Sequence, residues 1–294
     1  MKKTILSLLS FALVSTSFSQ NLCFSELHPV PSLPGGNFTP AFNDPSPNQS
    51  FVSDFNMDGN PDLLIVGTDV SGTGPGGISN IYIYLNDGTG QFTPDPANQF
   101  SETGMQQRIA GVGDIDGDSD DDILVLSEML NKSFLYRNDG TGTFTVVSGS
   151  PFETIDLMSS AINAYPQFVD VDDDSDKDIF LGARLFLNDG TGNFTETTPL
   201  SDLTAFIQMT TFDVDNDGDP DAIVTGTSSS SGSVARIYLN DGTGNFSISS
   251  SSSSLIPVEQ GFIDYSDIDA DGDLDLIITG MNVTTHTSPT NLYT

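Results

Sequence analysis

An Asp-rich nonapeptide occurs five times along this chain, and each copy is followed directly by an apolar, strand-like run. The copies begin at Asp54 (DFNMDGNPD), Asp114 (DIDGDSDDD), Asp170 (DVDDDSDKD), Asp213 (DVDNDGDPD) and Asp267 (DIDADGDLD). Side-chain oxygens at loop positions 1, 3 and 5, with an Asp at position 9, are ligands that suit a hard cation such as Ca²⁺. Crowded carboxylates repel one another unless a cation lies among them. The repeat therefore predicts one calcium-type loop in each of five structural units.

We expect the side chains at positions 1, 3, 5 and 9 of each loop to converge on the ion, with the position-7 backbone carbonyl as a further ligand. The candidate ligands are Asp54, Asn56, Asp58, Asp62, Asp114, Asp116, Asp118, Asp122, Asp170, Asp172, Asp174, Asp178, Asp213, Asp215, Asp217, Asp221, Asp267, Asp269, Asp271 and Asp275. Position 6 favours a residue that tolerates a left-handed backbone, and Ser119 and Ser175 replace Gly there in two loops, which predicts strained or weaker sites. An EF-hand does not fit, because position 12 is apolar and no helix flanks the loop. Asx-type turns without metal are the alternative.

A second signature lies between successive Asp loops. It reads LNDGTGQF (85–92), RNDGTGTF (137–144), LNDGTGNF (187–194) and LNDGTGNF (239–246). Asn, Asp and Gly tolerate the positive φ of tight hairpins, so each copy predicts a β-hairpin. Each repeat can then be written as four short strands: one before the Asp loop, one after it, one before the hairpin and one that starts at the Phe after it. The strand after the loop is expected at 63–67, 123–127, 179–183, 222–226 and 276–280.

Short four-stranded sheets at this period predict an all-β fold, a β-propeller of which about five blades are visible. The tyrosines of the strands before the hairpins, such as Tyr84, Tyr136 and Tyr238, are expected to fill the space between blades. The serine-rich segment 249–254 predicts a solvated, flexible connection between two blades. Two interpretations of the chain ends stay open. Either an N-terminal strand around 36–39 completes the fifth blade, or the sequence is a fragment of a larger propeller.

The formal net charge is −33, from 41 acidic and 8 basic side chains. The acidic side chains concentrate in the five nonapeptides, so the charge is mostly a local supply of ligands. A chain this acidic is repelled by phosphate backbones and anionic membranes, which argues against nucleic-acid binding. A single cysteine, Cys23, excludes a disulfide framework.

The first residues resemble a secretory signal. Lys2 and Lys3 precede an apolar run that is too short to span a bilayer, and small residues follow it. We therefore expect a signal peptide at 1–19, a lead-in at 20–36 and the propeller at 37–294, with no transmembrane segment in the mature chain. The style of the signal suggests bacterial export to the exterior or the cell surface. A lipid anchor on Cys23 is an open alternative.

On the Asp loops and the NDGTGxF hairpins, residues 37–294 resemble the FG-GAP/VCBS repeat family, which is related to integrin α-subunit propellers. The resemblance implies one Ca²⁺ per blade, up to five here, held by the loop between the first two strands. The chain departs from the pattern because literal FG and GAP motifs are poorly kept, and because five loops are visible where integrin-type propellers have seven blades.

Catalytic signatures are scarce in the sequence. His28 and His286 belong to no metal or triad pattern, so we expect no enzyme activity. The resemblance implies an extracellular interaction or adhesion module with a protein or glycan partner. Two alternatives remain: a polysaccharide-active lyase or hydrolase, which would need Glu102, Glu128 or Glu259 to converge in one cleft, and a purely structural repeat region of a larger surface protein.

Overall fold

The computed structural model describes residues 49–69, 78–95, 100, 107–127, 131–156, 166–282, 285 and 287–293. These residues form five antiparallel sheets and two short 3₁₀ helices, η1 (Pro151–Thr154) and η3 (Ser250–Ser254). The first sheet contains β1 (Gln49–Ser53), β2 (Asp62–Asp69), β3 (Ile78–Asn86) and β4 (Phe92–Pro94). The second contains β5 (Gln107–Gly113), β6 (Asp122–Ser127), β7 (Lys132–Arg137) and β8 (Thr145–Val146). The third contains β9 (Gln167–Val169), β10 (Asp178–Leu181), β11 (Arg184–Asn188) and β12 (Phe194–Thr197). The fourth contains β13 (Leu203–Phe212), β14 (Asp221–Ser228), β15 (Gly232–Asn240) and β16 (Phe246–Ile248). The fifth contains β17 (Glu259–Ser266), β18 (Asp275–Met281) and β19 (Thr290–Tyr293).

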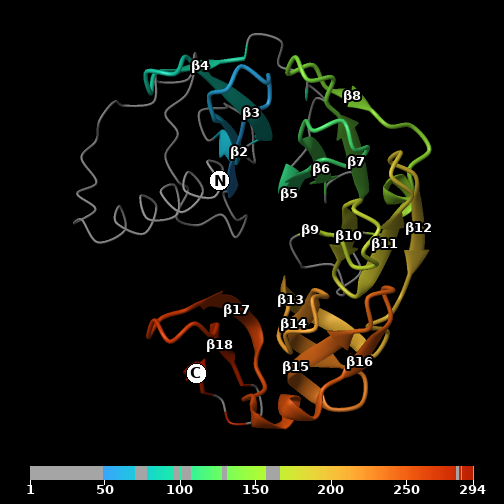
Figure 1. Ribbon diagram of the computed structural model, residues 1–294, viewed down its shortest axis with the longest axis vertical. Helices are drawn as coiled ribbons and strands as arrows, with labels where there is room; N and C mark the ends of the chain where they lie inside the picture. The colour runs from blue at the N-terminus through green and yellow to red at the C-terminus, as the bar shows by residue number, and fades with distance from the viewer. Residues whose placement is uncertain are drawn as a thin grey trace, which may run out of the picture.

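The five sheets follow one another in chain order around a common centre (Figure 1). Strands pair in sequence order within each sheet, so β5, β9 and β13 lie toward the centre and β8, β12 and β16 lie at the outside. This arrangement is a β-propeller with five visible blades, as the repeat pattern predicts. Four blades have four strands, and the described part of the fifth has three.

In the second to fifth blades, the strand after the Asp loop is the most buried strand of its blade. Every residue of β6 and of β10 is buried, and all but one residue of β14. Continuous runs of Ile, Leu and Val suit such strands, because a neighbouring sheet covers each of their faces. The predicted positions at 123–127, 222–226 and 276–280 are confirmed, and β10 ends two residues earlier than expected.

Large side chains fill the space between blades. Tyr136 is 2% exposed and packs with Phe55, Phe100 and Phe144, which come from the first blade, from its connection to the second, and from the second hairpin. The rings of Phe100 and Tyr136 meet edge to face at 5.0 Å between centroids. Tyr238 is also buried, in the cluster between the third and fourth blades. The expected role between blades is therefore confirmed for Tyr136 and Tyr238, and Tyr84 is buried as well. The core is distributed over the blade junctions.

The serine-rich segment is more regular than its composition suggests. Ser249 caps helix η3 because its hydroxyl accepts the Ser251 N–H. The Ser252 hydroxyl accepts the Ile237 N–H at 2.9 Å and donates to the Ile237 carbonyl at 3.2 Å. Serine hydroxyls bond readily to nearby backbone groups, and here they fix the connection against β15.

Several sequence predictions lie outside the described residues. They concern the signal peptide 1–19, the lead-in 20–36, Cys23, His28, the strand-like stretch 36–39, Glu102, Glu128 and His286. Glu259 is described: it is 7% exposed on β17, and it accepts the Thr227 hydroxyl at 2.7 Å. Within the described ranges, no helix is long and apolar enough to cross a membrane.

Candidate metal centre

Each Asp loop connects the first and second strands of its blade. Position 1 follows directly after the first strand, and position 9 is the first residue of the second strand. In the second blade, for example, β5 ends at Gly113, the loop begins at Asp114, and Asp122 opens β6. Because the two strands pair with Gly113 opposite Asp122, the ends of the loop are held together by the sheet.

The loop backbone turns through the left-handed region twice. At position 6, Gly59, Gly218 and Gly272 have φ of 89°, 104° and 102°, and Ser119 and Ser175 both have φ of 76°. A serine in this region is unfavourable by about 1 kcal/mol or more, so the expectation of strain at these two positions agrees with the backbone. Position 4 is left-handed as well, at Met57, Gly117, Asp173, Asn216 and Ala270. Gly117, Asp173 and Asn216 are residue types that tolerate this region, whereas Met57 and Ala270 do not favour it.

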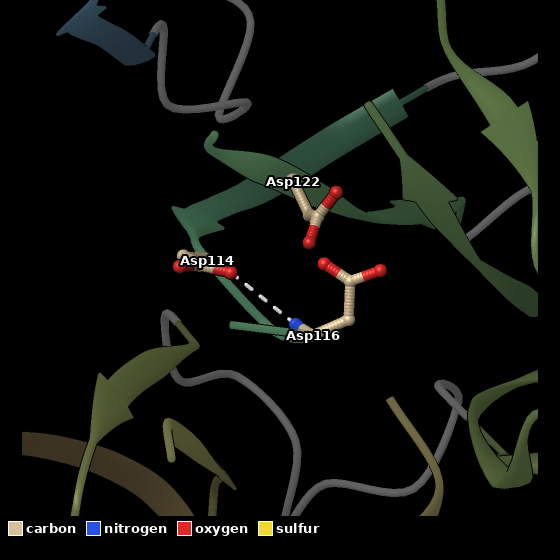
Figure 2. Close-up of side chains that lie close together, drawn as sticks. All are labelled: Asp114, Asp116 and Asp122. Atoms are coloured by element: carbon tan, nitrogen blue, oxygen red, sulfur yellow. Dashed lines mark hydrogen bonds between the residues drawn. The ribbon is translucent and has the colours of Figure 1, made fainter. Parts of the chain in front are cut away.

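Carboxylates converge in four of the loops. The groups in which each residue offers an oxygen within 4.8 Å of the others are Asp114, Asp116 and Asp122; Asp170, Asp172 and Asp178; Asp213, Asp215 and Asp221; and Asp267, Asp269 and Asp271. Figure 2 shows the second loop, where the carboxylates of Asp116 and Asp122 face each other and Asp114 lies beside them. Three groups thus join positions 1, 3 and 9, and the fifth loop joins positions 1, 3 and 5.

The position-5 side chain also supports the loop itself. Asp118, Asp174, Asp217 and Asp271 each accept the backbone N–H of position 7, at 3.0–3.2 Å. In the first loop, where Asn56 stands at position 3, Asp58 accepts the corresponding N–H of Asn60 at 2.9 Å. Carboxylate oxygens have further lone pairs, so these bonds leave capacity for a cation.

The Asp at position 9 joins the Asp loop to the hairpin of the same blade. One Asp122 oxygen accepts the Ile115 N–H at 3.0 Å, and the other accepts the Asn138 N–H at 2.7 Å. The same pair of bonds occurs at Asp62, Asp178 and Asp221. All four of these aspartates are fully buried. The two recurring sequence signatures are therefore parts of one hydrogen-bonded unit.

The hairpin Asn then links one blade to the preceding one. The Asn138 amide donates to the Phe55 carbonyl at 2.9 Å, Asn188 donates to Ile115 at 2.7 Å, and Asn240 donates to Val171 at 2.7 Å. Each acceptor is the position-2 residue of the previous blade's Asp loop. We call this contact the Asn clasp. Sequence reasoning assigned the Asn only to the turn, where positive φ instead falls on glycines such as Gly140 and Gly142, at 75° and 78°.

The loops hold more negative charge than their own hydrogen bonds neutralise. Burial raises the pKa of Asp122 to about 7 and that of Asp178 to about 6, although backbone N–H groups lower both. Burial and the nearby Asp118 raise the pKa of Asp120 to about 6. Buried Oδ1 atoms without a hydrogen-bond partner among the described residues occur on Asp116, Asp120, Asp170 and Asp172. Buried oxygens in this state are costly unless a cation or water binds them.

The hairpin aspartates differ from the loop aspartates. The Thr191 hydroxyl bonds Asp189 at 2.6 Å and, with the Asn193 side chain, lowers the pKa of Asp189 to about 2. The hydroxyl of Thr141 likewise holds the pKa of Asp139 below its usual value. These carboxylates are already satisfied within the turn, so we assign them a structural role.

This fold and this site define a propeller of Asp-loop repeats. The FG-GAP-like repeat model matches the chain at residues 54–125, 114–181, 170–224 and 213–278, so each match runs from one Asp loop into the next. The chain belongs to the FG-GAP-like repeat family, as the resemblance in its sequence implied. No curated protein matches the chain. Family and fold together support a repeat module of the interaction type.

Proposed function

We propose that this protein binds Ca²⁺ through its Asp loops, one ion per blade and up to five in all, and acts as an exported interaction or adhesion module. The Asp residues at positions 1, 3, 5 and 9, with Asn56 in the first loop, are the proposed ligands. The observation that carries the proposal is the set of buried, unpartnered carboxylate oxygens in the second and third loops, on Asp116, Asp120, Asp170 and Asp172. They lie within or beside groups whose oxygens already converge.

Calcium fits these loops better than the other common cations do. The donors are carboxylate oxygens and no sulfur or imidazole group takes part, which favours a hard cation over zinc. A site made of several carboxylate oxygens suits the high, variable coordination number of Ca²⁺ more than the strict octahedron of Mg²⁺. In this site the protein supplies convergence and charge, and the ion would relieve the repulsion among the carboxylates.

The proposed role of the ion is structural. Extracellular calcium sites have dissociation constants of about 10⁻⁴–10⁻³ M, so about 1 mM calcium stabilises the fold by about 0.4–1.4 kcal/mol per site. Five such sites add up to a few kcal/mol, which is comparable with the whole stability of an ordinary domain.

Thermal unfolding with and without calcium tests the metal proposal. The melting temperature should rise between EGTA and about 5 mM calcium, and magnesium at the same concentration should have a smaller effect. The double variant Asp215→Asn/Asp217→Asn should bind one ion fewer by titration calorimetry. The variant Asp87→Asn/Asp241→Asn removes the same charge from two hairpins and serves as the control. Equal stoichiometry in all three proteins would contradict the ligand assignment.

Export and partner binding are separate parts of the proposal. The signal-like residues 1–19 support export, which fractionation of cells expressing the full chain would test. The propeller fold supports interaction, and a calcium-dependent screen against glycans and surface proteins would test it. Two alternatives remain. Turnover of a polysaccharide would favour a lyase or hydrolase activity, and a screen that finds no binding partner would favour a purely structural role.

A further inference from the structure

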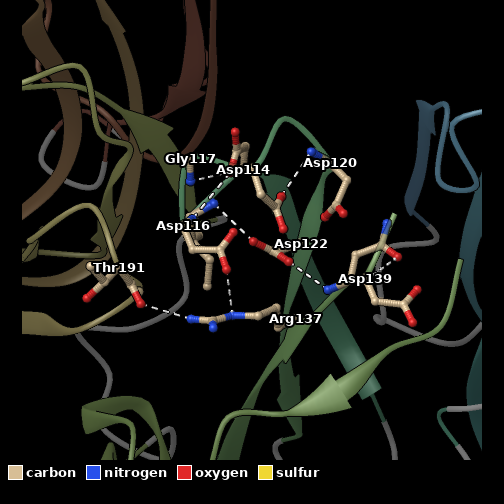
Figure 3. Close-up of polar contacts among 12 residues, drawn as sticks. Asp114, Asp116, Gly117, Asp120, Asp122, Arg137, Asp139 and Thr191 are labelled. Atoms are coloured by element: carbon tan, nitrogen blue, oxygen red, sulfur yellow. Dashed lines mark hydrogen bonds and ion pairs between the residues drawn. The ribbon is translucent and has the colours of Figure 1, made fainter. Parts of the chain in front are cut away.

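One hairpin differs from the others at the residue before its Asn. Leu85, Leu187 and Leu239 occupy this position in three hairpins, and Arg137 occupies it in the second. The leucines pack against the clusters between blades. The guanidinium of Arg137 instead extends over the second Asp loop (Figure 3).

Arg137 contacts two blades at once. Its Nε lies 2.9 Å from Oδ2 of Asp116, at position 3 of its own blade's loop. Its Nη2 donates to the Thr191 carbonyl at 2.9 Å, in the hairpin of the third blade. It also lies so close to Gly192 that an added Cβ there would be 2.6 Å from Nη2. The guanidinium therefore occupies a tight position at the junction of the second and third blades.

The Asp116 carboxylate is shared between Arg137 and the candidate metal position. Oδ2 pairs with Arg137, while Oδ1 is buried and finds no hydrogen-bond partner among the described residues. Asp116 belongs to the converging group with Asp114 and Asp122. A cation bound there would share a carboxylate with a guanidinium, and the two positive charges would repel each other.

We propose that Arg137 is a resident counter-ion of the second Asp loop: it weakens calcium binding at that loop and keeps the junction of the second and third blades stable when calcium is low. This inference rests on the calcium binding proposed above. Without calcium, the guanidinium neutralises one of the crowded carboxylates. With calcium, part of that benefit is lost, so Arg137 stabilises the calcium-free state more than the loaded state.

The size of the effect follows from Coulomb's law. A divalent ion and a guanidinium about 6 Å apart repel each other enough to change a dissociation constant by about tenfold, even at the dielectric constant of water. The side chain of Arg137 is 36% exposed, so solvent and salt screen the interaction. We therefore expect a three- to tenfold effect. By linkage, saturating calcium lowers the effect of Arg137 on the folding equilibrium constant by the same three- to tenfold factor.

The test compares Arg137→Gln with a matched control. Arg184→Gln removes the same charge from an ion pair in which Arg184 Nε lies 3.5 Å from Glu196 Oε1. Arg184 is the first residue of β11, at the end of the blade away from its Asp loop. Thermal unfolding of the full chain in EGTA and in about 5 mM calcium, with calcium titration by calorimetry, gives the difference between the two conditions. A third variant, Arg137→Gln/Asp114→Asn, removes a ligand of the second loop and is compared with Asp114→Asn alone.

The expected result is a larger loss of melting temperature for Arg137→Gln in EGTA than in calcium, with one site binding three- to tenfold more tightly. The loss for Arg184→Gln should be the same in both conditions. In the Asp114→Asn background, the loss caused by Arg137→Gln should no longer depend on calcium.

Equal losses for Arg137→Gln in both conditions would overturn the proposal, because they would mean that Arg137 stabilises the protein only through contacts that do not depend on calcium, such as its bond with Thr191. A larger loss in calcium would also overturn it, because Arg137 would then hold Asp116 in place for the ion. Absence of calcium uptake by the unmodified protein would remove the proposed function itself.

Discussion

The Asn clasp should contribute measurably to stability, and the chain contains an internal comparison that shows how much. Asn188 is 6% exposed and makes four hydrogen bonds: to the carbonyls of Ile115 and Lys177, and from the N–H groups of Asp189 and Gly192, at 2.7–3.2 Å. Asn86 occupies the same place in the first hairpin. Among the described residues, its side chain bonds only to its own blade, at the Pro61 carbonyl (2.9 Å) and the Gly88 N–H (3.1 Å).

Replacing each Asn by Ala removes these bonds. A net hydrogen bond contributes about 1 kcal/mol, so Asn188→Ala should lower the free energy of unfolding by about 3–4 kcal/mol. Asn86→Ala should lower it by about 1 kcal/mol, because water reaches this half-exposed side chain and replaces part of what is lost. The difference of about 2–3 kcal/mol is the part due to the contact between blades and to burial.

Urea unfolding and thermal unfolding both measure this difference. For a domain of this size the melting temperature should fall by roughly 6–16 °C in Asn188→Ala and by roughly 2–4 °C in Asn86→Ala. Neither Asn is a candidate metal ligand, so both losses should be similar in calcium and in EGTA. Equal destabilisation of the two variants would refute the reasoning, since it would mean that the link to the preceding blade contributes nothing.

Three further predictions concern titration and the hairpin backbone. Burial raises the pKa of Asp122 to about 7, above its value in the unfolded chain, so the calcium-free protein should lose stability as pH rises from about 4 through 7. Calcium must compete with the proton on Asp122. Calorimetry should therefore show the calcium affinity of the second loop falling about ten- to a hundredfold between pH 7.5 and 5. An NMR titration should place the pKa of Asp189 near 2, and Thr191→Val should raise it toward 3.8; an unchanged value would contradict the hydroxyl's assigned role. Thermal unfolding should show a larger loss for Gly192→Ala than for Gly90→Ala, because φ is similar (79° and 82°) but only the first added Cβ meets a neighbour within 4 Å.

The sequence predicted the blades well because both of its signals are local. Apolar runs and hairpin residues specify short strands through contacts within a few positions, and the strand expected at 222–226 lies within β14 (Asp221–Ser228). The convergence of positions 1, 3 and 9 in three loops was also expected from their spacing. Calcium binding itself stays a prediction.

The sequence did not reveal contacts that depend on how blades stack. The Asn of each hairpin reads as a turn residue, and nothing local indicates that the Asn240 amide reaches Val171 in another sheet. The left-handed backbone at Met57 and Ala270 was missed for a related reason: loop closure imposes it, although neither residue favours it. Arg137 could have been noticed as the single departure from leucine. Its partner Asp116 becomes a neighbour only when the second blade folds, and Thr191 only when the third blade packs against the second.

The Asn clasp also gives the chain a direction of assembly. The carbonyl that a clasp binds belongs to one blade, and the amide that binds it arrives with the following blade, 69–83 residues later in the chain. During synthesis, each of the first three blades therefore lacks the amide partner of the position-2 carbonyl in its Asp loop until the next hairpin leaves the ribosome. Blades should reach their final hydrogen-bonded state one after another from the N-terminal side, because each Asn clasp forms only when the following repeat has folded. A nascent chain arrested between two repeats would end in a blade whose loop is held only by its own sheet, and protease should cut that last blade first.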